Sequence, residues 1–402
     1  MEKNGIIYRK SKCQNGGKKM IPNMLQTSPF IVITPDAASK KTIVKNSLLQ
    51  TEAFVENEAL DILKTCRYPQ ELTTLNLQYE SGKIQKAFDS GFLVNPATVW
   101  DETYITSIEI EAGTQCNWSC RYCPRSIDPK GSTVMSMELF NEIIDKAVRL
   151  RTVEYVTLNS YNEPAMDKYF ASRVRKIAES GLKLILHSNG SVLDKKKIKL
   201  LKDTNVLSIV YFNIPSLDES EFKRLTGSST YEQTIRNIDM AIENGFNVEL
   251  SIQGTEEELK RNLPALKAKY EPLTGKSIIA WGTGDRAGIL DNCYARGINI
   301  TEPLYGCSMV LNWIHIGVNG DLFICFNDYY QKNVYGNIKD GEFADILGNE
   351  KAKQIRKRVF GGENAPDDQM CRKCDEMYKA KCNAQFTTDY RPVFDLSVIN
   401  QG

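Results

Sequence analysis

The sequence is poor in histidine and has almost no net charge. It contains 2 His in 402 residues, which excludes metal sites built from several imidazoles. Catalysis by a Ser-His-Asp triad would have to use His187 or His315 as its base. Lys and Arg number 51 against 50 Asp and Glu, a net charge of +1. This balance argues against a protein that coats nucleic acid or an anionic membrane, so we expect neither as a partner.

Long apolar runs are also lacking. No window approaches the ~18 uninterrupted apolar residues of a membrane span. The first 20 residues hold no apolar run longer than three, whereas a secretory signal needs about 7–15 such residues. We therefore expect a cytoplasmic protein. Cysteine, in contrast, is abundant, with 11 residues. In a reducing compartment these thiols indicate metal or redox chemistry rather than a disulfide framework.

Changes of pattern divide the chain into four segments. Residues 1–29 are rich in Lys, Asn and Gly and are expected to form a flexible leader. Residues 30–97 have the size and element order of a small winged-helix-like module; a subdomain that only caps the next segment is the alternative. The elements expected there are a strand over 30–34, helices over 53–66, 71–79 and 81–88, and a closing strand over 91–94.

From residue 98 to 290 expected strands alternate with amphipathic helices. The strands are predicted over 105–111, 153–158, 182–187, 206–212, 248–252 and 277–281. This alternation indicates parallel βαβ units and an α/β fold. Six units suit either a partial barrel or a doubly wound sheet. In both, ligands bind at the carboxyl ends of the strands.

Residues 291–402 are dominated by Gly, Cys and turn residues. Two alternating apolar runs, 313–318 and 321–325, flank Asn319-Gly320, which is the strongest short signal for a β-hairpin. The same alternation places Trp313 and His315 on one face of that hairpin.

Three cysteines follow the first strand of the alternating segment directly. Cys116, Cys120 and Cys123 have the spacing C-x3-C-x2-C. Three thiolates on one loop can bind three irons of a four-iron cluster while the fourth iron stays open to a ligand. A zinc knuckle is the alternative, but no fourth Cys or His stands nearby to complete it.

This loop resembles that of the radical S-adenosylmethionine (radical SAM) enzymes. The resemblance implies a partial (β/α)6 barrel and a [4Fe–4S] cluster with an open iron, held by Cys116, Cys120 and Cys123. It implies reductive cleavage of S-adenosyl-L-methionine to a 5′-deoxyadenosyl radical, which abstracts hydrogen from the substrate. A reducing electron donor of the flavodoxin or ferredoxin type is implied as a partner.

The resemblance also implies contacts to S-adenosylmethionine at the ends of later strands. Tyr122 occupies the aromatic position that packs against adenine. Asn162-Glu163-Pro164 resembles the Gly-Gly-Glu-Pro stretch that holds the methionine amino group, with Tyr161-Asn162 in place of two glycines. The remaining predicted contacts are Ser188 and Asn189, in a turn that resembles Thr-Asn-Gly, and Asn213 and Gln253, where the family often contacts the ribose.

A second cysteine set lies in the last segment. Cys371 and Cys374 form a two-ligand turn, and the predicted hairpin brings Cys307 and Cys325 close together. The set resembles the SPASM extension of radical SAM enzymes, or its shorter twitch form. The full extension uses seven cysteines for two clusters, but the last two are absent here. The resemblance therefore implies one auxiliary [4Fe–4S] cluster on these four thiols.

Four cysteines stay outside both sets, namely Cys13, Cys66, Cys293 and Cys382. Cys382 is interpreted as a spare thiol, a ligand in a rearranged site or a hydrogen donor. The other three are expected to be inert, with a catalytic role as the alternative for Cys293. Cys66, on the inner face of its helix, is expected to be a core residue.

Weaker signals concern polar residues near the predicted site. Asp285 and Arg286, after the sixth strand, either contact substrate or cofactor or have a structural role. His187 is expected to be a core residue, with proton transfer as the alternative. His315 is expected to pack near the auxiliary cluster.

The resemblance identifies the protein as an enzyme and leaves its substrate open. A maturase that installs a crosslink, thioether or epimerised centre in a ribosomally made peptide is favoured, because residues 30–97 resemble the modules that bind leader peptides. A radical dehydrogenase of a sugar, cyclitol or aminoglycoside is the alternative. A non-catalytic iron–sulfur or zinc scaffold is the third reading.

Overall fold

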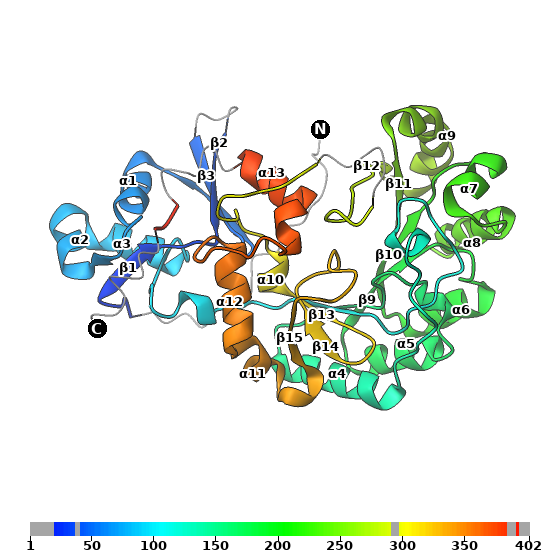
Figure 1. Ribbon diagram of the computed structural model, residues 1–402, viewed down its shortest axis with the longest axis horizontal. Helices are drawn as coiled ribbons and strands as arrows, with labels where there is room; N and C mark the ends of the chain where they lie inside the picture. Colours follow the sequence, from blue (N-terminus) through cyan, green and yellow to red (C-terminus); the bar gives the residue numbers. More distant parts are fainter. Residues whose placement is uncertain (1–19, 37–40, 291–296, 384–390, 394–402) are drawn as a thin grey trace.

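The computed structural model describes residues 20–36, 41–290, 297–383 and 391–393. In this part of the chain, a nine-stranded sheet forms the centre of the molecule (Figure 1). Six parallel strands follow one another in chain order, and each overlaps a strand expected from the sequence. They are β7 (Ser107–Ile110), β8 (Tyr155–Thr157), β9 (Lys183–Ser188), β10 (Leu207–Asn213), β11 (Val248–Gly254) and β12 (Ile279–Gly282).

Helices cover one face of this sheet, which we call the outer face (Figure 1). They are α4 (Met137–Leu150), α5 (Phe170–Glu179), α6 (Lys195–Thr204), α7 (Glu219–Thr226), α8 (Tyr231–Glu243) and α9 (Glu256–Thr274). Local capping explains where several begin. The Ser136 hydroxyl caps α4, and Thr255 forms a capping box with Glu258 at α9. Helix α7 was not expected from the sequence; Asp218 caps it.

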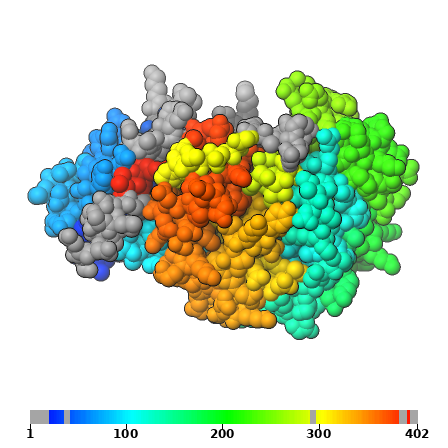
Figure 2. All heavy atoms as spheres, viewed as in Figure 1, coloured from blue at the N-terminus to red at the C-terminus, as the bar shows by residue number. Residues whose placement is uncertain are grey.

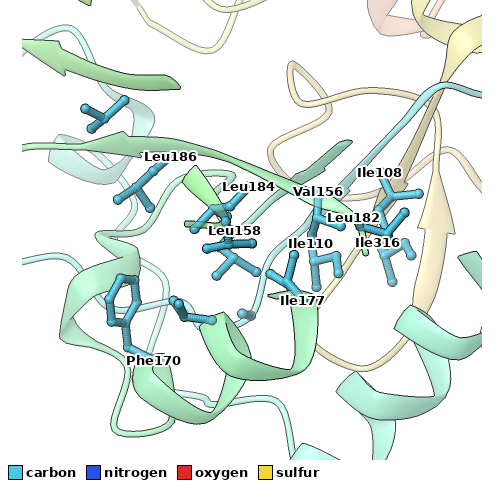
Figure 3. Close-up of a cluster of buried hydrophobic side chains, with 14 of the residues drawn as sticks. Ile108, Ile110, Val156, Leu158, Phe170, Ile177, Leu182, Leu184, Leu186 and Ile316 are labelled. Atoms are coloured by element: carbon cyan, nitrogen blue, oxygen red, sulfur yellow. The ribbon is translucent and has the colours of Figure 1, made fainter. Parts of the chain in front are cut away.

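The main hydrophobic core fills the space between the sheet and these helices. Figure 3 shows residues of the strands gathered in this core, with Ile110 next to Ile177 of α5 and Ile108 next to Ile316. Since side chains alternate along a strand, Ser107 and Glu109 face the opposite, inner side of the sheet. The inner face therefore carries the polar residues of the barrel strands.

The C-terminal segment extends the same sheet. Strand β13 (Trp313–Ile316) runs parallel to β7, and β14 (Asp321–Phe323) and β15 (Val334–Asn337) continue antiparallel. The expected Asn319-Gly320 hairpin is confirmed, with Ile316 paired to Leu322. The helices of this segment are α10 (Met309–Asn312), α11 (Phe343–Gly348), α12 (Glu350–Val359) and α13 (Asp375–Asn383), together with the 3-10 turns η4 (Ile338–Asp340) and η5 (Met370–Lys373).

The described residues of the N-terminal module form two small antiparallel sheets and three helices. One sheet is β1 (Met24–Thr27) between β5 (Gln70–Glu71) and β6 (Leu93–Val94); the other is β2 (Ile31–Asp36), β3 (Lys41–Asn46) and β4 (Thr51–Val55). The helices are α1 (Asn57–Thr65), α2 (Leu72–Gln78) and α3 (Ser81–Asp89).

Two sequence expectations for this module were wrong in part. Residues 24–27, placed in the flexible leader, form β1, and Leu25 is fully buried in the core of the module. The helix expected from residue 53 begins only at Asn57. Residues 51–55 pair with β3 instead, because their alternation of apolar and polar side chains suits a half-buried strand. The expected helices near 71–79 and 81–88 are present as α2 and α3.

The C-terminal segment lies between the N-terminal module and the barrel (Figure 2). A second hydrophobic core joins it to the module. In that core the ring of Phe30 packs edge-to-face against the rings of Trp100 and Phe360, with centroid distances of 5.8 Å and 4.9 Å. In the part of the chain described here, no helix is both long and apolar enough to cross a membrane.

Candidate functional site

Cys116, Cys120 and Cys123 lie on one loop after the carboxyl end of β7. Electrostatic contacts link Cys120 with each of the other two, so the loop brings the three thiols together. The loop is fixed from several sides: the Cys123 amide donates to the Cys120 carbonyl at 2.9 Å, and the Ser119 amide to the Thr226 carbonyl at 2.9 Å. The cysteine spacing in the sequence and the loop in the structure therefore both indicate one cluster of three thiols.

The donor set fits an iron–sulfur cluster rather than a single ion. Burial raises the pKa of the Cys116 thiol to about 11 and raises the pKa of Cys120 and Cys123 as well. Such thiols ionise only when a strong positive charge is bound. Among the described residues, no three Cys, His, Asp or Glu side chains are arranged around one metal ion. A cluster places each thiolate on a different iron, which suits thiols that are close but do not converge on one point.

Glu163 joins the loops after β8 and β9. Its carboxylate accepts hydrogen bonds from the Ser188 hydroxyl at 2.8 Å, the Asn189 amide at 2.6 Å and the Ala165 amide at 3.1 Å. The side chain of Asn189 in turn lies 4.0 Å from Cys116 Sγ, measured from its Nδ2. Glu163, Ser188 and Asn189 thus form one network next to the cysteine loop. Their contacts to S-adenosylmethionine stay predictions.

The other predicted cofactor residues lie around the same loop. The Tyr122 ring is 5% exposed, and its hydroxyl accepts a hydrogen bond from Asn213 Nδ2 at 3.0 Å. Gln253 Oε1 accepts from the Arg286 guanidinium at 3.3 Å. Asn162 lies in the loop before Glu163, where its side chain accepts from the Ser160 amide at 2.9 Å.

Arg286 is a further residue of the site that the sequence marked only weakly. Its charge acts on Cys123 and on Tyr161. Its backbone is left-handed, with φ of 53°, as is that of Ala287 at 57°. This unusual conformation, together with the bond to Gln253, holds the guanidinium beside the cysteine loop.

The four thiols of the second cysteine set lie near one another. The Cys325 thiol is in electrostatic contact with Cys307, Cys371 and Cys374, and burial raises its pKa. The Cys374 thiol accepts a contact from Asn327 Nδ2 at 3.7 Å. Four thiols from the approach to α10, the residues after β14 and η5 with its C-cap therefore lie together, two of them buried and two partly buried, as a cluster with four protein ligands requires.

The remaining thiols divide into two groups. Cys66 is fully buried in the core of the N-terminal module, and burial raises its pKa to about 12, which fits an inert thiol. Cys382 is exposed on α13. Cys13 and Cys293 lie outside the described residues.

Several polar residues of the inner face were not singled out from the sequence. Glu109, Thr157, Asn159 and Tyr161 each have a buried polar atom without a hydrogen-bond partner, among the described residues. For Glu109 and Thr157, alternation with apolar neighbours on their strands was the available signal. His187, expected in the core, also lies on this face, where solvent reaches its ring and Tyr211 stacks on it at 4.6 Å.

The burial of Glu163 leads to a prediction about pH. Desolvation raises the pKa of its carboxyl from 4.5 to about 7. A carboxyl with a raised folded pKa stabilises the fold most below its unfolded pKa, and this contribution is lost as pH rises through the folded pKa. Between pH 4.5 and 8 we expect the unfolding free energy of the wild type to fall by roughly 3 kcal/mol more than that of Glu163→Gln.

Urea denaturation at several pH values measures this difference. Glu232→Gln, which changes an exposed carboxyl on α8, is the control and should follow the wild type. Equal pH dependence of the wild type and Glu163→Gln would show that Glu163 does not titrate in this range.

Two family models match the chain over the two cysteine regions. The model described as the Radical SAM superfamily matches residues 110–262. The SPASM model, described as an iron–sulfur cluster-binding domain, matches residues 307–375, a range that begins at Cys307 and ends just after Cys374.

Individual relatives support the same assignment. The chain is 24% identical over 274 residues to an S-adenosyl-L-methionine-dependent 2-deoxy-scyllo-inosamine dehydrogenase of Niallia circulans, which covers 67% of this chain and 92% of the relative. It is 31% identical over 150 residues to a GTP 3',8-cyclase of Synechocystis sp., covering 37% of this chain and less than half, 45%, of the cyclase.

Solved structures show the likeness of the fold. Streptococcus suis SuiB bound to the precursor peptide SuiA has a TM-score of 0.54 at 13% identity, and the match covers 87% of this chain and 93% of SuiB. The histidine-tagged form of anSMEcpe with bound AdoMet has a TM-score of 0.51 at 14% identity, covering 70% of this chain and 85% of that protein.

The two matched domains identify the cofactors, and the two thiol sets fit them. These cofactors are a [4Fe–4S] cluster with S-adenosylmethionine and an auxiliary iron–sulfur cluster. When bound, the first cluster and S-adenosylmethionine would supply a 5′-deoxyadenosyl radical, and the protein's part would be to position them and exclude side reactions. With its barrel, its cysteine loop and its auxiliary tetrad, this chain belongs to the radical SAM superfamily and is a radical SAM enzyme with a C-terminal SPASM domain.

Proposed function

We propose that this radical SAM enzyme modifies a ribosomally synthesised peptide and that residues 30–97 bind the leader of that peptide. The observation that carries the proposal is the extent of the likeness to SuiB bound to its precursor peptide, which covers 87% of this chain and so reaches well beyond the barrel. The barrel and SPASM models together leave the first 109 residues unmatched, and most of that region is the folded N-terminal module.

The module offers a sheet edge for a peptide. In the three-stranded sheet β2-β3-β4, strand β4 lies at an edge. It carries Phe54, whose side chain is 60% exposed, and Glu52 is exposed beside it. An extended leader can add to such an edge through backbone hydrogen bonds, with an apolar side chain packing on Phe54.

Leader binding is the test of this function. The probe is a synthetic peptide covering the leader of the precursor encoded beside the gene, titrated by fluorescence anisotropy against the full chain. We expect Phe54→Ser to weaken binding by roughly tenfold, because it removes an exposed apolar contact from the edge. Leu273→Ser, a 57% exposed apolar residue on α9 far along the chain, is the matched control and should bind as the wild type does.

Absence of binding to any peptide encoded near the gene would contradict the peptide function. The alternative, oxidation of a small molecule, is favoured by one specific finding. The match to the 2-deoxy-scyllo-inosamine dehydrogenase covers 92% of that relative. However, it leaves about a third of this chain without a counterpart, which the leader-binding role of the module would explain.

A further inference from the structure

Three polar side chains stand side by side on the inner face of the sheet. Glu109 of β7 pairs in register with Thr157 of β8 on one side and with His315 of β13 on the other. The residues before and after each of them on their strands belong to the core on the outer face. Glu109, Thr157 and His315 therefore point to the same side, in one row across three neighbouring strands.

All three are deeply buried and lack hydrogen-bond partners. Their exposed fractions are 7% for Glu109, 1% for Thr157 and 0% for His315. In the described part of the chain, Glu109 Oε1, Thr157 Oγ1 and both imidazole nitrogens of His315 have no hydrogen-bond partner. Buried polar atoms are nearly always hydrogen-bonded, so a row of such atoms on three strands points to a ligand that bonds to them.

The row contains one carboxyl group, that of Glu109, beside the imidazole of His315. Glu109 Oε1 lies 3.5 Å from His315 Nδ1, and among the described residues no Lys or Arg nitrogen lies within ion-pair distance of the Glu109 carboxylate. The charge of Glu109 also acts on Tyr161 and His187. A buried carboxylate whose basic neighbour among the described residues is a histidine, rather than a Lys or Arg, can accommodate a ligand that brings a positive charge.

The row is also close to both thiol sets. The Tyr161 phenol is in electrostatic contact with Glu109, with Cys123 of the barrel loop and with Cys325 of the auxiliary tetrad. Its hydroxyl, too, is buried without a hydrogen-bond partner in the described structure. A group bound at Glu109 would therefore lie in the same region of the barrel as both thiol sets.

We propose that Glu109, Thr157 and His315 form a subsite for an ammonium group of the substrate. An ammonium carries three N–H donors, which match one oxygen of Glu109, the Thr157 hydroxyl oxygen and one imidazole nitrogen of His315. The Glu109 carboxylate supplies the counter-charge. The subsite rests on the proposed function only in which molecule supplies the ammonium group. In the proposed function it is a lysine side chain of the peptide, and in the alternative function it is the amine of an aminocyclitol.

The scarcity of histidine provides the measurement. The full, cluster-loaded chain labelled with 13C-histidine gives signals from His187 and His315 alone, and His187→Gln assigns them. The probes are n-butylammonium and its neutral isostere 1-butanol. We expect n-butylammonium to shift the His315 signal in a saturable way and 1-butanol to require at least about tenfold higher concentrations.

Substitutions test whether n-butylammonium binds at the Glu109 carboxylate. Glu109→Gln should raise the Kd of n-butylammonium at least about tenfold. Glu249→Gln is the matched control: Glu249 lies on the inner face of β11, but it has a cationic partner, Lys276, at 3.5 Å. This control should leave the Kd unchanged. The comparison of the two probes on the wild type needs no variant, so it decides the question even if Glu109→Gln does not fold.

Equal responses to n-butylammonium and 1-butanol, or an unchanged Kd in a folded Glu109→Gln chain, would overturn the subsite. Its source is distinguished by comparing Nα-acetyl-lysine amide with 2-aminocyclohexanol; tighter binding of the lysine derivative supports the peptide, and the reverse supports the aminocyclitol. Loss of leader binding with an intact ammonium response would overturn the peptide function alone.

Discussion

Cys120→Ser is expected to lower the formation of 5′-deoxyadenosine from S-adenosylmethionine by roughly 1,000-fold or more, since the radical cluster loses one of its three thiolate ligands. Cys120 is the appropriate position because it is in electrostatic contact with both other thiols of the loop. The serine differs by one atom and keeps the backbone bond between Cys120 and Cys123 available. The loss should therefore reflect the missing ligand rather than an altered loop.

The measurement is anaerobic reconstitution followed by dithionite, with 5′-deoxyadenosine quantified by liquid chromatography. Iron analysis should find about half of the wild-type iron, because the auxiliary tetrad is untouched. Cys382→Ser removes an exposed thiol and is the control; we expect wild-type iron and activity. Full activity in Cys120→Ser would contradict the assignment of the loop as the radical cluster site.

Cys325→Ser is expected to have the complementary effect. The charges of the other three thiols of the auxiliary tetrad all act on Cys325. Its loss should remove the auxiliary cluster and about half of the iron, while formation of 5′-deoxyadenosine stays within roughly threefold of the wild type. The segment 297–383 should also become more sensitive to proteolysis, because metal binding contributes directly to the stability of small metal-binding domains.

These two variants form a pair. Iron analysis, 5′-deoxyadenosine formation and limited proteolysis on both chains separate the two clusters. If the two clusters are independent, Cys120→Ser loses radical formation but keeps the protease resistance of 297–383. Cys325→Ser then keeps radical formation but loses that protease resistance. If Cys325→Ser lost 5′-deoxyadenosine formation as completely as Cys120→Ser, the two clusters would not be independent.

The parts of the fold that could be predicted from the sequence are those with strong local signals. Apolar runs separated by capped helices placed all six barrel strands, and Asn319-Gly320 placed the hairpin. The thiol sets were predictable because the family spacing of cysteines is specific. Strand β4 was missed because a run of five residues with mixed polarity reads equally well as the start of a helix.

The row of Glu109, Thr157 and His315 on the inner face could not be predicted from a sequence pattern. Glu109 and His315 are neighbours only because β13 joins the sheet beside β7, a pairing across more than two hundred positions. No local signal encodes that register. The contact of Tyr122 with Asn213 has the same origin, since a loop after one strand meets the end of another. Long-range pairings of this kind place the site, and sequence spacing alone does not contain them.

The pairing of β13 with β7 also determines the order in which the chain can assemble during synthesis. Strand β7 emerges from the ribosome early, but its second neighbour is translated only about two hundred residues later. Until then, one edge of β7 has unpaired backbone groups and is open to wrong partners. The row that contains Glu109 and His315 therefore does not exist before the hairpin docks. Thus a truncated chain that ends at the barrel would have an exposed sheet edge and an incomplete inner face, and the barrel and the C-terminal segment are best expressed and handled as one unit.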